Sequence, residues 1–151
     1  MNEATVEEYM HTPVFTISAD AGLDRALVIM QTQHIRHLPV VDEQHNLVGI
    51  ISSGNLRRLM VEDKNPSGGV KGYLLPALTK VRSVMITNVI KAHLEMTVAD
   101  AAMKMSELKI GALPVVDSSG KKVLGIITET DLLRLLAKAL KKPGGAGDFS
   151  L

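Results

Sequence analysis

The spacing of apolar side chains predicts a helix early in the chain. Leu23, Ala26, Leu27 and Met30 stand at positions i, i+3, i+4 and i+7. Residues three and four apart lie on the same face of an α-helix, so these side chains form one apolar stripe. We therefore expect a helix near residues 23–30 that buries this stripe.

Two short apolar runs after this helix predict strands. Residues 38–41 and 47–51 are rich in Val and Ile and are separated by the polar stretch 42–46. Apolar, β-branched runs that are bounded by polar turn residues are typical of strands. A second helix is expected to begin near Ser53.

The second half of the chain repeats this pattern. At a shift of 75 positions, 12 of the 40 residues in 6–45 are identical to their counterparts, and the shift becomes 76 after the second turn. The sequence LPVVD occurs in both halves, at 38–42 and at 113–117. In the second half, Thr97 followed three residues later by Asp100 is typical of a helix start. The chain therefore contains two copies of one unit of about 60 residues.

This internal repeat predicts the fold class and the domain division. We expect an α/β (α+β) protein with two pseudo-symmetric β-α-β-β-α repeats. A unit of about 60 residues rarely holds a sufficient core alone, so we expect the repeats to pack through their sheets. The expected division is a first repeat at 1–61, a linker at 62–80, a second repeat at 81–142 and a flexible C-terminal tail at 143–151.

Composition and charge exclude several classes of function. Cysteine is absent, which excludes disulfides and Cys-ligated metals. The formal net charge is +1 and aromatic residues make up 3% of the chain, so neither charge nor stacking favours nucleic-acid binding. The apolar runs are too short to span a membrane, and the acidic start lacks the order of a signal peptide. We expect a cytoplasmic protein without a nucleic-acid partner and without membrane insertion.

The repeated motifs resemble the CBS domain, which is named after cystathionine β-synthase. The resemblance rests on Met10, on the Leu-Pro-Val-Val-Asp strand and on the Gly-Ile-Ile-Ser/Thr stretch before a helix. It covers residues 6–60 and 81–139, and two such domains in tandem resemble a Bateman module. The resemblance implies a stand-alone CBS-domain protein that regulates and does not catalyse. It also implies a homodimer, and AMP, ADP, ATP or S-adenosylmethionine as candidate ligands in clefts between the two repeats.

The resemblance implies a ligand motif at the end of the second repeat. Residues 125–131 read Gly-Ile-Ile-Thr-Glu-Thr-Asp, which is the complete family motif. The carboxylate of Asp131 can accept hydrogen bonds from the vicinal hydroxyls of a ribose, and Thr128 can donate to phosphate. In the family, this motif is combined with a strand and a loop of the other repeat, where Arg36 and His37 would reach phosphate. The expected main site comprises Met10, Pro13, Val14, Phe15, Ile35, Arg36, His37, Ile126, Thr128, Thr130 and Asp131.

The corresponding motif of the first repeat departs from the family pattern. Residues 49–55 read Gly-Ile-Ile-Ser-Ser-Gly-Asn, so Asn55 stands where the carboxylate is expected. An amide has one acceptor oxygen and no charge. The positions that match the two cations hold Gly111 and Ala112. We therefore expect a degenerate second site comprising Asn88, Val89, Ile90, Ile110, Gly111, Ala112, Ile50, Ser52 and Asn55.

Simpler interpretations of these residues stay open at this point. Thr128 or Asp131 can serve only to cap the helix that follows, and Arg36 can be a solvated charge. His34, His37 and His45 suggest a metal site, but His34 and His37 precede a strand and no carboxylate partner is evident. No metal site and no cofactor are expected.

The predicted function is a regulatory module. It would sense an adenine nucleotide or another adenosyl ligand between its repeats and transmit binding to an unknown regulated protein by a conformational change. The alternative is a dimeric adaptor that binds no ligand and acts through protein interactions. No nucleophile–base pair or pair of carboxylates is visible, so an enzyme is not expected.

Overall fold

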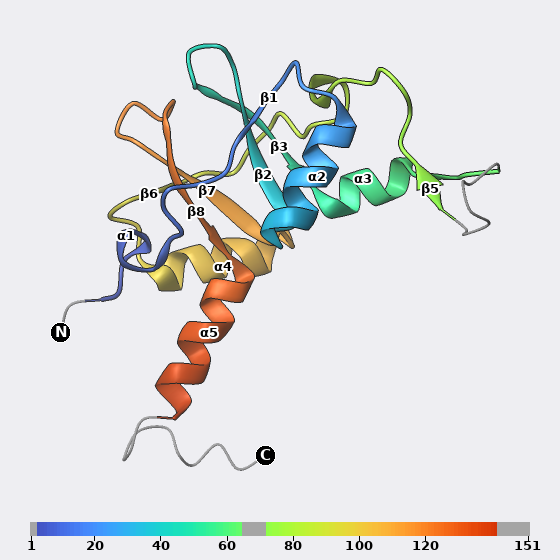
Figure 1. The fold of residues 1–151 in the computed structure, drawn as a ribbon. Coiled ribbons are helices and arrows are strands. Elements are labelled where there is room, and N and C mark those ends of the chain that lie inside the picture. Colours follow the sequence, from blue (N-terminus) through green and yellow to red (C-terminus); the bar gives the residue numbers. More distant parts are fainter. Residues whose placement is uncertain (1–2, 65–71, 142–151) are drawn as a thin grey trace. The chain divides into compact units, whose positions relative to one another are not determined.

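The computed structural model describes residues 3–64 and 72–141. Part of the expected linker, 65–71, and the whole expected tail, 143–151, lie outside the described residues. The described residues form five α-helices and three small sheets (Figure 1), which confirms the expected mixed α/β class. None of these helices is long and apolar enough to cross a membrane.

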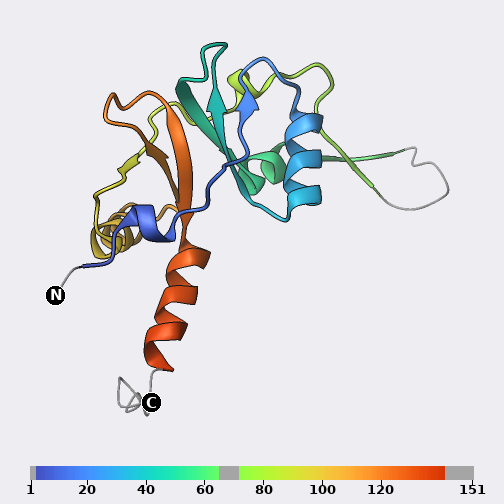
Figure 2. The same cartoon turned by 60° about the vertical axis from the view of Figure 1, so that its left-hand side comes forward.

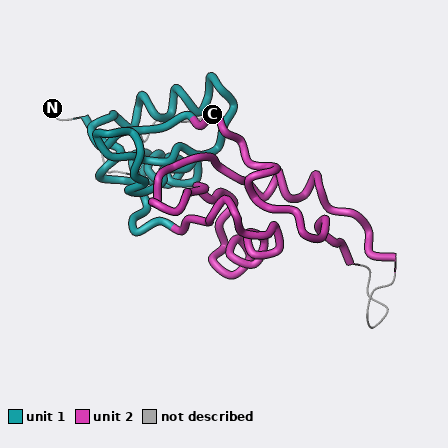
Figure 3. The backbone as a smooth tube through the Cα atoms, turned by 90° about the horizontal axis from the view of Figure 1, so that it is seen from above, with its two compact units in different colours: residues 1–14, 90–151 teal, residues 15–89 magenta. Residues whose placement is uncertain are grey.

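The chain forms two compact units, which Figure 3 colours separately. Unit 1 comprises residues 1–14 and 90–151, and unit 2 comprises residues 15–89. The units therefore do not coincide with the sequence repeats, because the first residues of each repeat belong to the other unit. The start of the first repeat belongs to the unit that holds the sheet of the second repeat, and residues 81–89 belong to the unit that holds the sheet of the first. The division into repeats at 1–61 and 81–142 stays a prediction.

Unit 2 contains a three-stranded sheet and two helices (Figures 1 and 2). The strands lie in the order β1 (Ile17–Ser18), β2 (His37–Val41) and β3 (Leu47–Ser52). β1 pairs parallel with β2, and β2 pairs antiparallel with β3. The helices α2 (Leu23–Gln33) and α3 (Ser53–Leu59) contact each other, and each contacts a strand of the sheet. These elements match the predicted strand, helix, strand, strand and helix.

The core of unit 2 contains the predicted apolar stripe. Leu23, Ala26 and Met30 of α2 are buried together with residues of the sheet. Val81, the first residue of the short 3₁₀ helix η2 (Val81–Ser83), is completely buried in the same cluster. The start of the second repeat therefore supplies part of this core.

A two-stranded hairpin lies within the region that the sequence assigned mainly to the linker. It pairs β4 (Val61–Glu62) with β5 (Tyr73–Leu74) in antiparallel register. The side chains of Val61 and Tyr73 are 58% and 71% exposed. The apolar residues of this hairpin thus contribute little to the core of unit 2.

Unit 1 repeats the same arrangement. Its sheet has the order β6 (Ala92–His93), β7 (Ala112–Val116) and β8 (Val123–Thr128), again parallel and then antiparallel. Its two long helices, α4 (Val98–Leu108) and α5 (Glu129–Leu140), contact each other. The side chain of Thr97, the residue before α4, accepts a hydrogen bond from the backbone N–H of Asp100, as the sequence predicts.

The N-terminal segment is part of the core of unit 1. Val6, the first residue of α1 (Val6–Tyr9), is completely buried in a cluster that includes Leu113 and Ile127. The backbone N–H of Val6 donates to the carbonyl of Met96 over 2.8 Å. α1 therefore contributes Val6 to the core around the second repeat's sheet, and η2 contributes Val81 to the core around the first repeat's sheet.

The Asp residue that ends both LPVVD sequences shapes a turn in each unit. Asp42 Oδ1 accepts from the backbone N–H groups of Gln44 and Asn46 over 2.9 Å each. Asp117 Oδ1 accepts from the hydroxyl of Ser119 over 2.6 Å, and this hydrogen bond holds the pKa of Asp117 below its usual value. The position after LPVV in each repeat thus stabilises the turn to the next strand.

Candidate functional site

The first turn of α5 is capped by the two polar residues of the ligand motif. Asp131 Oδ2 accepts hydrogen bonds from the backbone N–H of Thr128 over 2.8 Å and from its hydroxyl over 3.0 Å. In return, Thr128 Oγ1 accepts from the backbone N–H of Asp131 over 3.4 Å. This reciprocal arrangement is a capping box. The capping role that the sequence leaves open is therefore real, and it uses one carboxylate oxygen.

The second carboxylate oxygen of Asp131 lies outside the cap. Asp131 Oδ1 is 2.5 Å from Nε2 of His11. Asp131 is 8% exposed, and it is the one charged residue that is buried within residues 3–64 and 72–141. Burial of a carboxylate is costly unless it is paired. Asp131 thus carries more acceptor capacity than helix capping requires.

His11 is held beside β8 by its backbone. Its N–H donates to the carbonyl of Ile126 over 2.9 Å, and the N–H of Ile126 donates back to the carbonyl of His11 over 3.1 Å. The hydroxyl of Thr12 donates to the carbonyl of Leu124 over 3.0 Å. A Cβ atom on Gly125 would lie only 2.7 Å from the His11 carbonyl oxygen. The glycine of the motif is therefore required for this close approach.

Replacing Gly125 by Ala is expected to destabilise the protein by about 1–3 kcal/mol, because the new methyl group forces the backbone at His11 away from β8. Urea unfolding measures this change. Gly54→Ala in α3 is the matched control, since its nearest neighbour is Ser52 Oγ at 3.6 Å. A helical Gly→Ala change with room for the methyl group stabilises by about 0.5–1 kcal/mol. Equal effects of the two substitutions would refute the steric argument.

Seven of the expected main-site residues belong to unit 1, and their sharing of one site stays a prediction. Met10 lies against Gly125 and packs on the core, and Ile126, the bridge partner of His11, is buried. Pro13 is exposed and Val14 is half-buried at the end of this segment. The unit 1 members are Met10, Pro13, Val14, Ile126, Thr128, Thr130 and Asp131.

The other expected main-site residues belong to unit 2. Phe15 is 50% exposed, Arg36 is exposed and His37 is half-buried at the start of β2. The carbonyl of Arg36 accepts from the backbone N–H of Ser53 over 2.9 Å and so contacts the start of α3. The participation of Phe15, Ile35, Arg36 and His37 in a shared site stays a prediction.

The corresponding motif of unit 2 caps α3 with an amide in place of a carboxylate. Asn55 Oδ1 accepts from the backbone N–H and the hydroxyl of Ser52 over 2.8 and 2.9 Å. This amide oxygen makes the same two hydrogen bonds as Asp131 Oδ2 makes in unit 1. The other atom of the amide is a nitrogen, which donates and does not accept. Ile50 pairs with Ile86 through two backbone hydrogen bonds of 2.9 Å, so Ile86 takes the place that His11 has beside Ile126.

The remaining members of the degenerate site are divided between the two units. Asn88 and Val89 belong to unit 2, whereas Ile90, Ile110, Gly111 and Ala112 belong to unit 1. The carbonyl of Gly111 accepts from the backbone N–H of Glu129 over 3.0 Å. The Gly111 carbonyl thus binds the first residue of α5, in the same way as the Arg36 carbonyl binds the first residue of α3. Whether these residues share a site stays a prediction.

Sequence reasoning missed His11. The signal for it was a paired difference between the repeats, because His11 matches Ile86 at the shift of 75 and Asp131 matches Asn55 at the shift of 76. The first repeat has His11 where the second has Ile86, and the second has Asp131 where the first has Asn55. The two differences occur at positions that are equivalent in the two repeats. For metals, no group of three or more His, Asp or Glu residues converges in the part of the chain that the structure describes.

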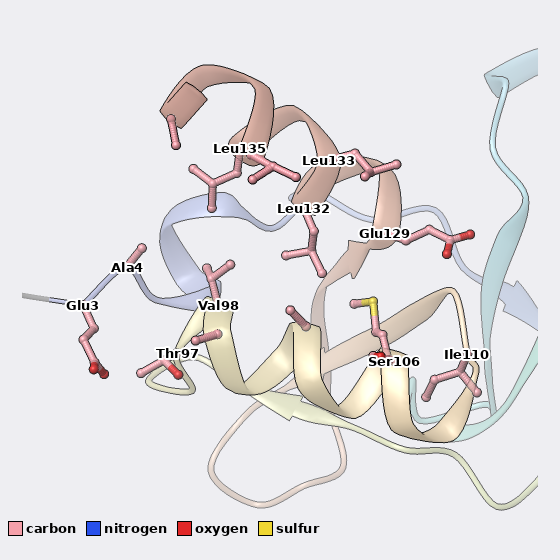
Figure 4. A pocket seen from close by; sticks show the side chains of 15 residues that line it. Glu3, Ala4, Thr97, Val98, Ser106, Ile110, Glu129, Leu132, Leu133 and Leu135 are labelled. Carbon is pink, nitrogen blue, oxygen red and sulfur yellow. The ribbon is translucent and has the colours of Figure 1, made fainter. Parts of the chain in front are cut away.

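An apolar groove of about 740 Å³ runs between α4 and α5 in unit 1 (Figure 4). Leu132 points from α5 towards α4. Leu133 and Leu136, which also line the groove, are 64% and 52% exposed. Contiguous exposed apolar surface is typical of interaction surfaces.

Comparison with known proteins gives one family for both halves of the chain. Residues 6–62 and 81–138 each match the family model of the CBS domain. A CBS domain-containing protein of Dictyostelium discoideum is 36% identical over 136 residues, which cover 90% of this chain and 93% of that protein. Other relatives are enzymes by name, namely homoserine O-acetyltransferases and a sulfurtransferase of archaea. The chain spans only 23–25% of their length.

Two similar solved structures contain adenosine derivatives. The CBS domain pair of protein MJ0100, solved with 5′-methylthioadenosine and S-adenosyl-L-methionine, has a TM-score of 0.75 and 31% identity, covering 91% of this chain and 98% of that one. CBSX2, solved in complex with AMP, has a TM-score of 0.71 and 27% identity, covering 89% and 97%. These ligands share an adenine and a ribose.

Proposed function

Because this chain belongs to the CBS domain family, we propose that it is a regulatory module that binds an adenosine-containing ligand. The candidates are AMP, ADP, ATP and S-adenosylmethionine. One observation carries the proposal: Asp131 is a buried carboxylate whose cap uses only Oδ2, so that Oδ1, which contacts the half-exposed imidazole of His11, is not needed for the helix and can serve a ligand donor. The ligands of similar CBS pairs support the same class of molecule.

The chemistry of the motif suits a ribose. Two vicinal hydroxyls can donate to one carboxylate, and such charge-assisted hydrogen bonds are stronger than neutral ones. The Thr128 hydroxyl already donates to Asp131, and the N–H groups of Asp131 and Glu129 already donate to Thr128 Oγ1 and to the Gly111 carbonyl. The proposal therefore rests on the carboxylate and not on an anion site at the start of α5. We propose that Asp131 carries the dominant site. The site of Asn55 is weaker because its amide oxygen already caps α3.

A thermal-shift screen tests the proposed function. The wild-type chain is heated at one protein concentration with AMP, ADP, ATP, S-adenosylmethionine or 5′-methylthioadenosine. A ligand at 100 times its Kd stabilises the folded state by about 2.7 kcal/mol. For a chain of this size that raises Tm by roughly 5–10 °C. If none of these compounds shifts Tm, the ligand-binding function is wrong and the adaptor alternative replaces it.

We also propose that binding acts by shifting a conformational equilibrium, which an unknown partner protein detects. Such a shift requires the ligand to bind one conformation more tightly than another. The expected cytoplasmic location belongs to the same proposal. In this function the chain has no chemical step of its own, and the enzyme names of longer relatives describe proteins in which the matched segment is a minor part.

We propose that a second copy of the chain covers the groove between α4 and α5. Three features support a homodimer: the groove is lined mainly by Leu and Ala, its exposed leucines come from one helix, and the net charge of +1 gives two copies little reason to repel each other. A two-fold pair would bury the same face of both copies. The family resemblance implies the same assembly.

Leu133→Asp combined with Leu136→Asp is expected to convert the dimer to a monomer, because each copy would place two carboxylates in the apolar interface. Sedimentation velocity at micromolar concentration measures the change. Leu78→Asp is the control, since Leu78 is completely exposed and does not line the groove. A wild-type chain that sediments as a monomer, or a double variant that stays dimeric, contradicts this assembly.

A further inference from the structure

His11 and Asp131 form a contact that no feature of the fold requires. The backbone of His11 is already fixed by two hydrogen bonds to Ile126, and the carboxylate of Asp131 already caps α5 through Oδ2. The imidazole is 58% exposed, so its burial gains little. The contact joins Nε2 to Oδ1, the one carboxylate oxygen that the cap does not use. An Nε2–H group can donate to it whether the ring is neutral or protonated.

Unit 2 provides a control for this arrangement within the same molecule. Its cap uses Asn55, and the residue at the position of His11 is Ile86. The backbone pairing of Ile86 with Ile50 matches that of His11 with Ile126. A histidine is thus present where the cap has a spare acceptor oxygen, and it is absent where the cap has none. This argues that the imidazole serves the spare oxygen and not the backbone geometry.

We infer that His11 occupies the ribose-binding oxygen of Asp131 in the ligand-free protein and is displaced by the vicinal hydroxyls of an adenosine-containing ligand. This inference rests on the proposed function and identifies the ribose hydroxyls as the part of the ligand that competes with His11. A single hydroxyl gains one hydrogen bond and must break the contact with His11. A vicinal diol brings two donors to the carboxylate and offsets that loss. His11 therefore weakens the binding of every ligand that must displace it, and it does not affect a ligand that lacks the ribose hydroxyls.

The test uses variants that remove the imidazole. His11→Ala removes it entirely, and His11→Ile reproduces the residue at the equivalent position of unit 2. Either variant should bind 5′-methylthioadenosine and AMP about 3- to 10-fold more tightly than wild type, because the ligand no longer competes with a hydrogen bond to a charged group. Isothermal titration calorimetry measures the Kd. Thermal melting of each variant confirms that it is folded.

Three controls assign the effect to the carboxylate and to the ribose. In an Asp131→Asn background, His11→Ala should give no gain in affinity. Ile86→Ala, the matched change in unit 2, should leave the Kd unchanged. AMP is compared with 2′,3′-dideoxy-AMP, whose Kd should not respond to His11→Ala because it lacks both hydroxyls. 5′-Methylthioadenosine has no phosphate, so a gain with this probe cannot come from a change in phosphate contacts.

The outcomes separate this inference from the proposed function. Tighter binding of both probes by the His11 variants, dependent on Asp131, supports the competition. Unchanged or weaker binding by these variants, when wild type binds the probes, overturns the competition and leaves the proposed function standing. If neither the wild type nor any variant binds AMP or 5′-methylthioadenosine, the competition is overturned. If all five compounds of the thermal-shift screen also fail, the proposed function is overturned with it.

Discussion

Asp131→Asn is expected to weaken the binding of AMP and 5′-methylthioadenosine at least about 30-fold and to change the free energy of unfolding by no more than about 1 kcal/mol. The structure explains this separation, because Asn55 makes the same cap in unit 2 with an amide oxygen. The amide nitrogen of the variant would stand in place of Oδ1. Since a nitrogen donor cannot accept from a ribose hydroxyl, the ligand loses its contacts while the helix keeps its cap.

Isothermal titration calorimetry measures the affinity in this experiment, and urea unfolding measures the stability. Asp131→Ala is the comparison that loses the cap as well, and it should cost about 1 kcal/mol more in stability than Asp131→Asn. Asn55→Ala should lower stability by a similar amount and leave the affinity of the main site nearly unchanged. Equal losses of affinity in the Asn55 and Asp131 variants would contradict the assignment of one dominant site.

Val6→Asp is expected to unfold unit 1 locally and to destabilise it by more than about 4 kcal/mol, because it places an unpaired carboxylate in a core position. Val6 is completely buried beside Leu113 and Ile127, which stand more than 100 positions later in the sequence. Hydrogen exchange followed by mass spectrometry locates the effect. Amide protection should be lost in β7 (Ala112–Val116) and kept in β2 (His37–Val41).

Val81→Asp is the matched substitution, because Val81 occupies the equivalent position of the second repeat and is completely buried in the core of unit 2. Protection should now be lost in β2 and kept in β7. Each substitution is thus expected to act on the sheet of the other repeat. The reverse pattern, in which each substitution acts within its own repeat, would contradict the division into units described above.

The elements near the sheets could be predicted because local patterns determine them. The stripe of Leu23, Ala26 and Met30 indicates a helix whichever core it joins, and these residues are buried as expected. The cap of α4 could also be predicted, because Thr97 is followed three residues later by Asp100. The helix stripe and the helix cap depend only on residues that are close in the sequence, and the element pattern occurs in both repeats.

The exchange of segments between the repeats could not be predicted in the same way. The apolar character of Val6 indicates that it is buried, but two cores of nearly the same sequence were available to it. The His11–Asp131 contact was missed for a related reason. His11 lies 120 positions from Asp131, and only the simultaneous change to Ile86 and Asn55 at the equivalent positions connects the two.

The candidate site was predicted in its chemistry more than in its geometry. The motif 125–131 pointed to Asp131 and Thr128, and both residues cap α5 with one carboxylate oxygen to spare. The capping and binding interpretations, which the sequence presents as alternatives, are compatible because a carboxylate has two oxygens. Asn55 has only one, and this oxygen already caps α3, which supports the proposal that its motif is the weaker one.

A crystal structure of the chain with 5′-methylthioadenosine tests the central claim most directly. We expect both ribose hydroxyls within about 2.6–3.2 Å of the Asp131 carboxylate, with His11 turned away from Oδ1 and the cap through Oδ2 intact. A nucleoside bound elsewhere, or bound beside an Asp131 that still contacts His11 and makes no hydrogen bond to the ribose, would contradict the account.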